Sequence, residues 1–201
     1  SFPTRRSSDL QFLSRLGYDV QGWGRGRNIR PADADLSALV DQASDLKARS
    51  GTPVSLVGWS RGGILAREVA RRLPQDIRLV VTLGSPFAAP GASNVRALWS
   101  LLTGQPYTPP SAERVSQLAA PIPVPSTSIF TRQDGVVAWR ACLEQEGDRR
   151  ENVEVRTTHL GLGFHPPALW VVADRLAQPL GSWAPFKPAP HLAPFFPKTS
   201  A

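Results

Sequence analysis

The stretch LVGWSRGG, residues 56–63, decides the fold and the kind of chemistry that the chain can support. It places Ser60 at the end of an apolar run, with Gly58 two residues before it and Gly62 two residues after it. A serine in a sharp strand-to-helix turn takes a strained backbone with positive φ. We expect a Cβ at either glycine to collide with neighbouring backbone, and Gly63 to extend this close approach into the helix.

The segments on either side fit such a turn. Residues 54–57 form an apolar strand pattern, and residues 64–73 have the periodicity of an amphipathic helix. The pentapeptide Gly58-Trp59-Ser60-Arg61-Gly62 therefore matches the G-x-S-x-G nucleophile elbow. The backbone N–H of Arg61 is the expected donor to a developing oxyanion, and we expect the second donor in a loop upstream of the present chain.

A serine nucleophile needs a base and a group that orients the base. In the architecture that carries a G-x-S-x-G elbow, these follow one another along the chain as serine, acid and histidine. Asp134 follows the predicted strand at 126–131, and His159 stands at the end of the predicted strand at 152–158. We therefore predict Ser60 as nucleophile, Asp134 as acid and His159 as base, with a satisfied core histidine as the alternative interpretation of His159.

Other residues of these types fit simpler roles. The polar stretch that holds the remaining candidate acids indicates a solvated helix end or loop; these acids are Glu144, Glu146 and Asp148. His165 precedes two prolines and is expected to cap a helix, and His191 lies in a proline-rich tail. Cys142 is expected to be a small buried core residue. One cysteine and three separated histidines give no metal-ligand spacing, so we expect no metal.

Strand and helix patterns alternate along the chain, which predicts a parallel sheet with helices on its faces, an α/β fold. We expect five strands, over residues 18–23, 52–59, 76–84, 126–131 and 152–158. Helices are predicted over residues 12–17, 31–51, 64–73, 94–104, between 110 and 120, around 137–142 and over 166–178.

The predicted core spans residues 11–178, and three segments are expected to differ from it: an insertion within the core and the two ends of the chain. Residues 88–125 break the alternation and are predicted to be a helical cap or lid, while residues 179–201 form a proline-rich tail that wraps the surface or stays loose. SFPTRRSSDL, residues 1–10, resembles the translation of a common sequencing adapter. Because the chain also contains no methionine, we expect an artefactual tail here and native sequence missing upstream.

Composition excludes several function classes. The net charge of +7 comes from scattered arginines with no aromatic-interleaved stripe, so nucleic-acid binding is not expected. No apolar run approaches the roughly 18 residues of a membrane span. GWGRGRN, residues 22–28, fails the dinucleotide pattern at Arg27 and is expected to line a substrate site through Trp23. Trp99, on the apolar side of the predicted lid helix, is the second expected substrate contact.

The sequence resembles the α/β-hydrolase superfamily, in particular its bacterial lipase- and esterase-like members. The resemblance rests on GYDVQGWG, LVGWSRGG, VVTLGSPF, RQDGVV and THLGLG. It implies a mostly parallel sheet flanked by helices, here lacking its first strands. It also implies a serine hydrolase that needs no cofactor and cleaves a small-molecule or lipid-like ester through an acyl-enzyme on Ser60.

Two alternatives stay open. The same three residues serve an acyltransferase, and a catalytically silent binding module can use the same fold. Oligomeric state is left open, as is localisation, for which the cytoplasm is the default because any signal peptide would lie upstream.

Overall fold

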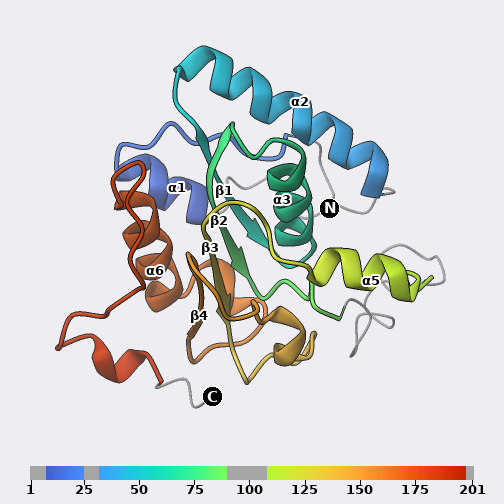
Figure 1. Ribbon diagram of the computed structural model, residues 1–201. Coiled ribbons are helices and arrows are strands. Elements are labelled where there is room, and N and C mark those ends of the chain that lie inside the picture. The colour runs from blue at the N-terminus through green and yellow to red at the C-terminus, as the bar shows by residue number, and fades with distance from the viewer. Residues whose placement is uncertain (1–7, 25–31, 90–107, 198–201) are drawn as a thin grey trace.

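A four-stranded parallel sheet forms the centre of the molecule (Figure 1). The computed structural model describes residues 8–24, 32–89 and 108–197. The strands follow one another in sequence order across the sheet: β1 (Val54–Trp59), β2 (Ile77–Leu83), β3 (Ser126–Phe130) and β4 (Arg150–Glu154). The predicted α/β class with a parallel sheet is thereby confirmed.

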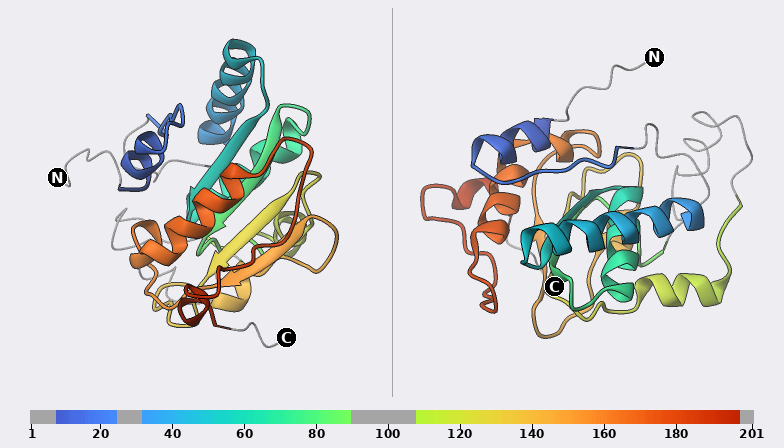
Figure 2. Two further views of the ribbon diagram at one scale, coloured as in Figure 1. Left: turned by 90° about the vertical axis from the view of Figure 1, so that its left-hand side faces the viewer. Right: turned by 90° about the horizontal axis from the view of Figure 1, so that it is seen from above.

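Helices cover both faces of this sheet (Figures 1 and 2). The α-helices are α1 (Ser8–Arg15), α2 (Ala32–Ser50), α3 (Arg61–Arg72), α5 (Ala112–Ala119) and α6 (Pro166–Ala177). Short 3-10 helices are η1 (Trp139–Cys142), η2 (Gly161–Gly163) and η3 (Ala193–Phe195). α2 and α3 contribute to the apolar core on one face, and α1 and α6 to the core on the other.

The composition of β2 explains its place inside the sheet. Val80 belongs to the core cluster under α2 and α3, whereas Val81 belongs to the cluster under α1 and α6, and both are fully buried. Successive side chains of a strand point to opposite faces, so a strand covered on both faces needs a continuous apolar run. The β-branched run of β2 meets that requirement.

The strand register brings the ends of the strands together. Trp59 lies beside Leu83, Leu83 beside Ile129, and Ile129 beside Val153, so all four parallel strands finish at the same edge. Side chains in the segments that follow each strand can therefore meet above this edge, although the segments are far apart in sequence.

The predicted strand at 18–23 is wrong. Within the described residues the sheet has four strands, not five, and residues 18–23 run without a ladder partner. Tyr18 and Val20, two residues apart, pack on one apolar cluster and Trp23 packs on the other, so side-chain packing and not strand pairing holds this segment. Gln42 of α2 donates a hydrogen bond from Nε2 to the Gly22 carbonyl oxygen (3.2 Å), which ties this segment to the helix.

The segments outside the core differ in what the structure describes. The helix expected at 94–104 lies outside the described residues, and α5 corresponds to the second helical stretch of the predicted lid. α1 begins at Ser8, so residues 8–10 of the expected artefactual tail belong to a helix. Among the helices that the structure describes, none is both long and apolar enough to cross a bilayer.

The proline-rich tail is mostly exposed, but it contacts the core at a few positions, among them Ala184, Phe186 and Phe196. Figure 2 shows the path of this tail. Arg175 of α6 is almost fully buried and donates from Nη1 to Glu151 Oε1 at 2.8 Å. Glu151 Oε2 in turn accepts the Phe186 backbone N–H at 2.6 Å. Phe186 and Phe196 also pack against the core cluster of α1 and α6.

Candidate active site

Ser60 sits in the turn between β1 and α3 with a backbone φ of 53°. A Cβ added to Gly58 would lie 2.5 Å from the Gly63 Cα, and one added to Gly63 would lie 2.8 Å from the Ser85 Cβ and 2.9 Å from the Gly58 carbonyl oxygen. The expected close approach is therefore present at Gly58 and Gly63. The expectation for Gly62 is wrong, because a Cβ there would meet no atom within 4 Å.

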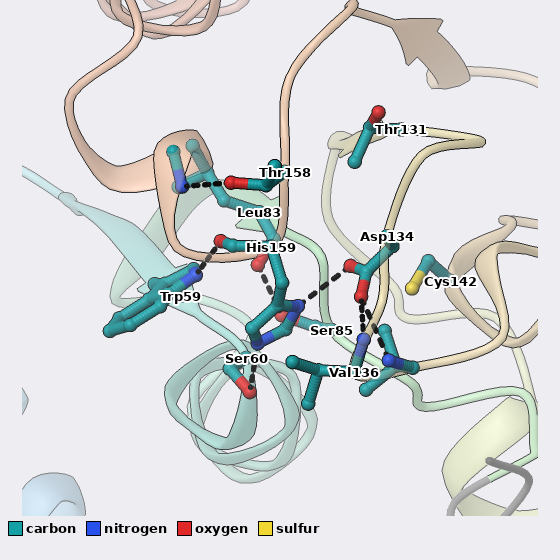
Figure 3. A network of polar contacts seen from close by, with 12 residues as sticks. Trp59, Ser60, Leu83, Ser85, Thr131, Asp134, Val136, Cys142, Thr158 and His159 are labelled. Atoms are coloured by element: carbon teal, nitrogen blue, oxygen red, sulfur yellow. Dashed lines mark hydrogen bonds and ion pairs between the residues drawn. The ribbon is translucent and has the colours of Figure 1, made fainter. Parts of the chain in front are cut away.

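The structure brings Ser60, His159 and Asp134 into one hydrogen-bonded chain (Figure 3). His159 Nε2 lies 3.1 Å from Ser60 Oγ, and His159 Nδ1 lies 2.7 Å from Asp134 Oδ2. The side chains of His159 and Asp134 are only 4% and 1% exposed. Both distances suit hydrogen bonds, so a proton can pass between the serine hydroxyl and an imidazole whose other nitrogen faces a carboxylate.

Asp134 is held as a carboxylate. Burial raises the pKa of its carboxyl, but the hydrogen bonds from His159 and from the backbone N–H groups of Val137 and Val136 outweigh burial, so the pKa lies below its ordinary value. The two backbone groups donate to Asp134 Oδ1 at 2.8 Å each, which leaves Oδ2 for His159. The aspartate can thus orient the imidazole and offset a positive charge on it.

The segments after β3 and β4 are joined to each other near this chain of contacts. Thr131, directly after β3, donates from Oγ1 to the Thr157 carbonyl oxygen at 2.7 Å. β4 ends at Glu154, earlier than the predicted 158, so His159 follows a short turn and not the strand itself. The Gly161 backbone N–H donates to Thr158 Oγ1 (3.2 Å), which closes that turn around His159.

Gly84 is a residue of the site that sequence reasoning missed. It follows β2 with a φ of +55°, and an added Cβ would lie 2.6 Å from Leu162 Cδ1, 3.2 Å from His159 Nδ1 and 3.4 Å from Asp134 Oδ2. The missing side chain therefore leaves the space that the imidazole and carboxylate occupy. The signal is present as a glycine directly after a buried strand, in VVTLGSPF, but the sequence pattern alone gives that glycine no role.

Arg61 opens α3, where backbone N–H groups point toward the N-terminal end of the helix and favour negative charge. The role of the Arg61 backbone N–H as oxyanion donor stays a prediction. The guanidinium of Arg61 forms an ion pair with Asp35 of α2 at 3.2 Å, and the Asp35 side chain is fully buried. The side chain of Arg61 thus links α2 to the turn that carries Ser60.

The other candidate residues form no hydrogen bond with Ser60, His159 or Asp134 among the described contacts. Glu144 was expected in a solvated stretch, and that is wrong, because it forms a buried ion pair with Arg67. Cys142 is buried as expected, and burial followed by the Asp134 charge raises the pKa of its thiol to about 12. Among the described residues, no group of three or more His, Cys, Asp or Glu side chains could hold a metal ion.

His165 takes the position before α6, but its side chain makes no capping hydrogen bond, which corrects the expected role. Burial lowers the pKa of its imidazole. His191 lies exposed in the tail.

The expected substrate contacts are divided between described and undescribed parts. Trp99 lies outside the described residues. Trp23 and Trp59 both line a cavity of about 750 Å³ along β1, between the segment at 18–23 and α2. Apolar side chains predominate on its walls, including Tyr18, Val20 and Leu39. The cavity reaches Gly58 and Gly62, so it borders the turn that holds Ser60.

Comparison with known proteins identifies the family of the chain. Residues 5–198 match the alpha/beta hydrolase family, so the chain belongs to that family. A search of curated proteins found no match.

Solved structures show the same fold. They include Aspergillus fumigatus lipase B (16% identity, TM-score 0.59, covering 75% of this chain and 43% of that one) and a Pyrococcus furiosus esterase (15%, 0.57, 79% and 66%). A pyrethroid hydrolase from Sphingobium faniae JZ-2 matches at 16% identity and a TM-score of 0.55, covering 85% of this chain and 90% of that one. The chain therefore spans less than half of the lipase and about two thirds of the esterase.

Proposed function

We propose that the protein is a serine hydrolase that cleaves carboxylic esters through an acyl-enzyme on Ser60. The observation that carries the proposal is the continuous contact from Ser60 Oγ through the His159 ring to the Asp134 carboxylate, at 3.1 and 2.7 Å. The strained backbone of Ser60, in the strand-to-helix turn of an alpha/beta hydrolase, supports the same role.

The mechanism rests on the placement of these groups. His159 Nε2 accepts the proton of the Ser60 hydroxyl while Oγ attacks the ester carbonyl carbon, and Asp134 stabilises the resulting imidazolium. The negative charge on the former carbonyl oxygen faces the N-terminus of α3, where the Arg61 backbone N–H is a donor. His159 then protonates the departing alcohol, and the C–O bond to it breaks.

The second half of the reaction repeats these steps with water. His159 removes a proton from water, whose oxygen attacks the acyl carbon of the Ser60 ester. The tetrahedral intermediate collapses, the proton returns to Ser60 Oγ, and the carboxylic acid leaves. Every proton moves through one imidazole, so no cofactor takes part in the proposal.

The proposed substrate is an ester with an apolar acyl part. The cavity beside the Ser60 turn supports this choice through its apolar walls and through Trp23 and Trp59. Two of the structures with the same fold are named as a lipase and an esterase, which agrees with ester substrates. We also propose that residues 88–125 form a cap inserted between two strands of the core; its described helix, α5, is joined to α3 by an ion pair between Arg114 and Glu68.

A fluorophosphonate that reacts with activated serines tests the proposal. Intact mass spectrometry should show one adduct on the wild-type chain and none on Ser60→Ala or His159→Ala. Ser182→Ala and His191→Ala, both at exposed tail positions, serve as matched controls and should label like wild type. Absence of an adduct on a folded wild-type chain would refute the proposal and favour a silent binding module. Product analysis with added alcohols or thiols separates hydrolysis from acyl transfer.

A further inference from the structure

The proposed base is part of a segment that leaves β4 at Glu154 and enters α6 at Pro166. This segment contains only a short 3-10 helix, so the position of His159 depends on contacts with other elements. One such contact is the hydrogen bond from Thr131 to the Thr157 carbonyl oxygen, two residues before His159.

A second contact comes from the turn that carries Ser60. Trp59 donates its indole Nε1–H to the carbonyl oxygen of His159 at 3.0 Å (Figure 3). The same indole lies against the His159 imidazole, with ring centroids 5.6 Å apart and planes inclined by 37°. Trp59 therefore contacts both the backbone and the ring of His159.

Trp59 is also bonded covalently to Ser60, since it is the last residue of β1. One side chain thus joins the strand that fixes the nucleophile to a base that lies 100 residues further along the chain. Trp59 as a residue is 41% exposed, yet its indole N–H is hydrogen-bonded within the protein.

We propose that Trp59 is a positioning residue that sets the distance between Ser60 Oγ and His159 Nε2. This inference rests on the proposed function. Loss of the indole N–H leaves the His159 carbonyl without its donor and frees the turn around it. Because a displacement of about 1 Å between reacting groups lowers rates by about 10²-fold, even a small shift of the imidazole is measurable.

Trp59→Phe tests the inference because phenylalanine keeps an aromatic ring and removes the N–H. The matched control is Trp170→Phe, at a half-exposed tryptophan on α6. Rates of Ser60 labelling are measured with a small probe, diisopropyl fluorophosphate, and with a fluorophosphonate carrying a long alkyl chain. We expect Trp59→Phe to slow both probes by the same factor, about 10- to 100-fold, and Trp170→Phe to slow neither. On an ester substrate, kcat should fall while KM stays unchanged.

A residue that only lined the substrate site would change the labelling rates in a different way. If Trp59 only contacted the substrate, the long-chain probe alone would react more slowly and KM would rise. Either that result or wild-type rates with both probes would overturn the inference. A wild-type chain that takes no label at all would instead refute the proposed function, and the inference would fall with it.

Solvent exchange of the indole protons gives a readout that does not depend on reactivity. Trp59 and Trp170 are similarly exposed, at 41% and 50%. By NMR, the Trp59 indole proton should exchange more slowly than that of Trp170, because it is hydrogen-bonded to His159. Equal exchange rates would mean that the bond is not made and would overturn the inference even if Trp59→Phe unfolds.

Discussion

Gly84 and Gly51 both have positive φ, so alanine substitutions at the two positions separate the steric role of Gly84 from the cost of a left-handed backbone. Gly84 has a φ of +55° and stands against Leu162, His159 and Asp134, whereas Gly51, after α2, has a φ of +70° and an added Cβ there would meet nothing within 4 Å. Alanine at either position must adopt a left-handed backbone. Only alanine at Gly84 must also displace side chains of the candidate site.

The size of each effect comes from these contacts. A left-handed backbone costs a non-glycine residue about 1–2 kcal/mol, which is the whole expected effect of Gly51→Ala. Overpacking adds about 1–3 kcal/mol, so Gly84→Ala should destabilise by about 2–5 kcal/mol in all. For a chain of this length, each kcal/mol lowers Tm by about 2–4 °C. We expect Tm to fall by about 2–8 °C for Gly51→Ala and by about 4–20 °C for Gly84→Ala.

Thermal unfolding followed by circular dichroism and fluorophosphonate labelling at a temperature where both variants are folded provide the two measurements. Displacement of His159 or Asp134 by about 1 Å should slow labelling of Gly84→Ala by about 10²-fold. Gly51→Ala should label at the wild-type rate. Equal losses of Tm in the two variants, together with wild-type labelling of Gly84→Ala, would refute the steric argument.

Three further predictions concern buried ionisable groups. The pKa of Asp134 is lowered in the folded chain, so this residue contributes its full stabilisation above the unfolded pKa of about 3.9. That stabilisation is lost as pH falls through the folded pKa. Asp134→Asn should therefore make the free energy of unfolding, measured by denaturant titration, depend less on pH in this acid range. Glu144→Ala leaves Arg67 buried without its partner and should cost about 3–5 kcal/mol, whereas Glu146→Ala, at an exposed position, should change stability by less than about 0.5 kcal/mol in the same chemical denaturation. Cys142, whose thiol pKa is raised to about 12, should react with a disulfide reagent at pH 8 only after unfolding, and fast reaction of the folded chain would contradict its burial.

The sequence predicted the frame of the site because the relevant signals are local. Gly58 and Ser60 stand directly after an apolar run, and a parallel sheet places the ends of its strands at one edge, so Asp134 and His159 could be expected near Ser60 from their positions after later strands. The nucleophile-elbow motif, the expected order of serine, acid and histidine along the chain, and the strand order together placed these residues in one region.

What the sequence missed depends on contacts between distant segments. Tyr18 and Val20 alternate with polar residues as they would in a strand, but an unpaired extended segment that packs on the core gives the same pattern, so the pattern cannot tell whether a partner strand is present. Likewise, the polar surroundings of Glu144 in sequence give no sign of Arg67, its partner 77 residues away. Pairings of this kind require the tertiary fold.

Contacts of the tail with the core extend the folded unit beyond the end of α6. Glu151 of β4 accepts the backbone N–H of Phe186, and Phe186 and Phe196 pack on the same apolar cluster as Val153 of β4. A chain that ended at Ala177, the last residue of α6, would lack the packing of Phe186 and Phe196 and would expose one face of the edge strand β4 to water. Proteolysis between Ala177 and Phe186 should therefore leave a fragment that exposes apolar surface and aggregates, and not a stable monomeric core.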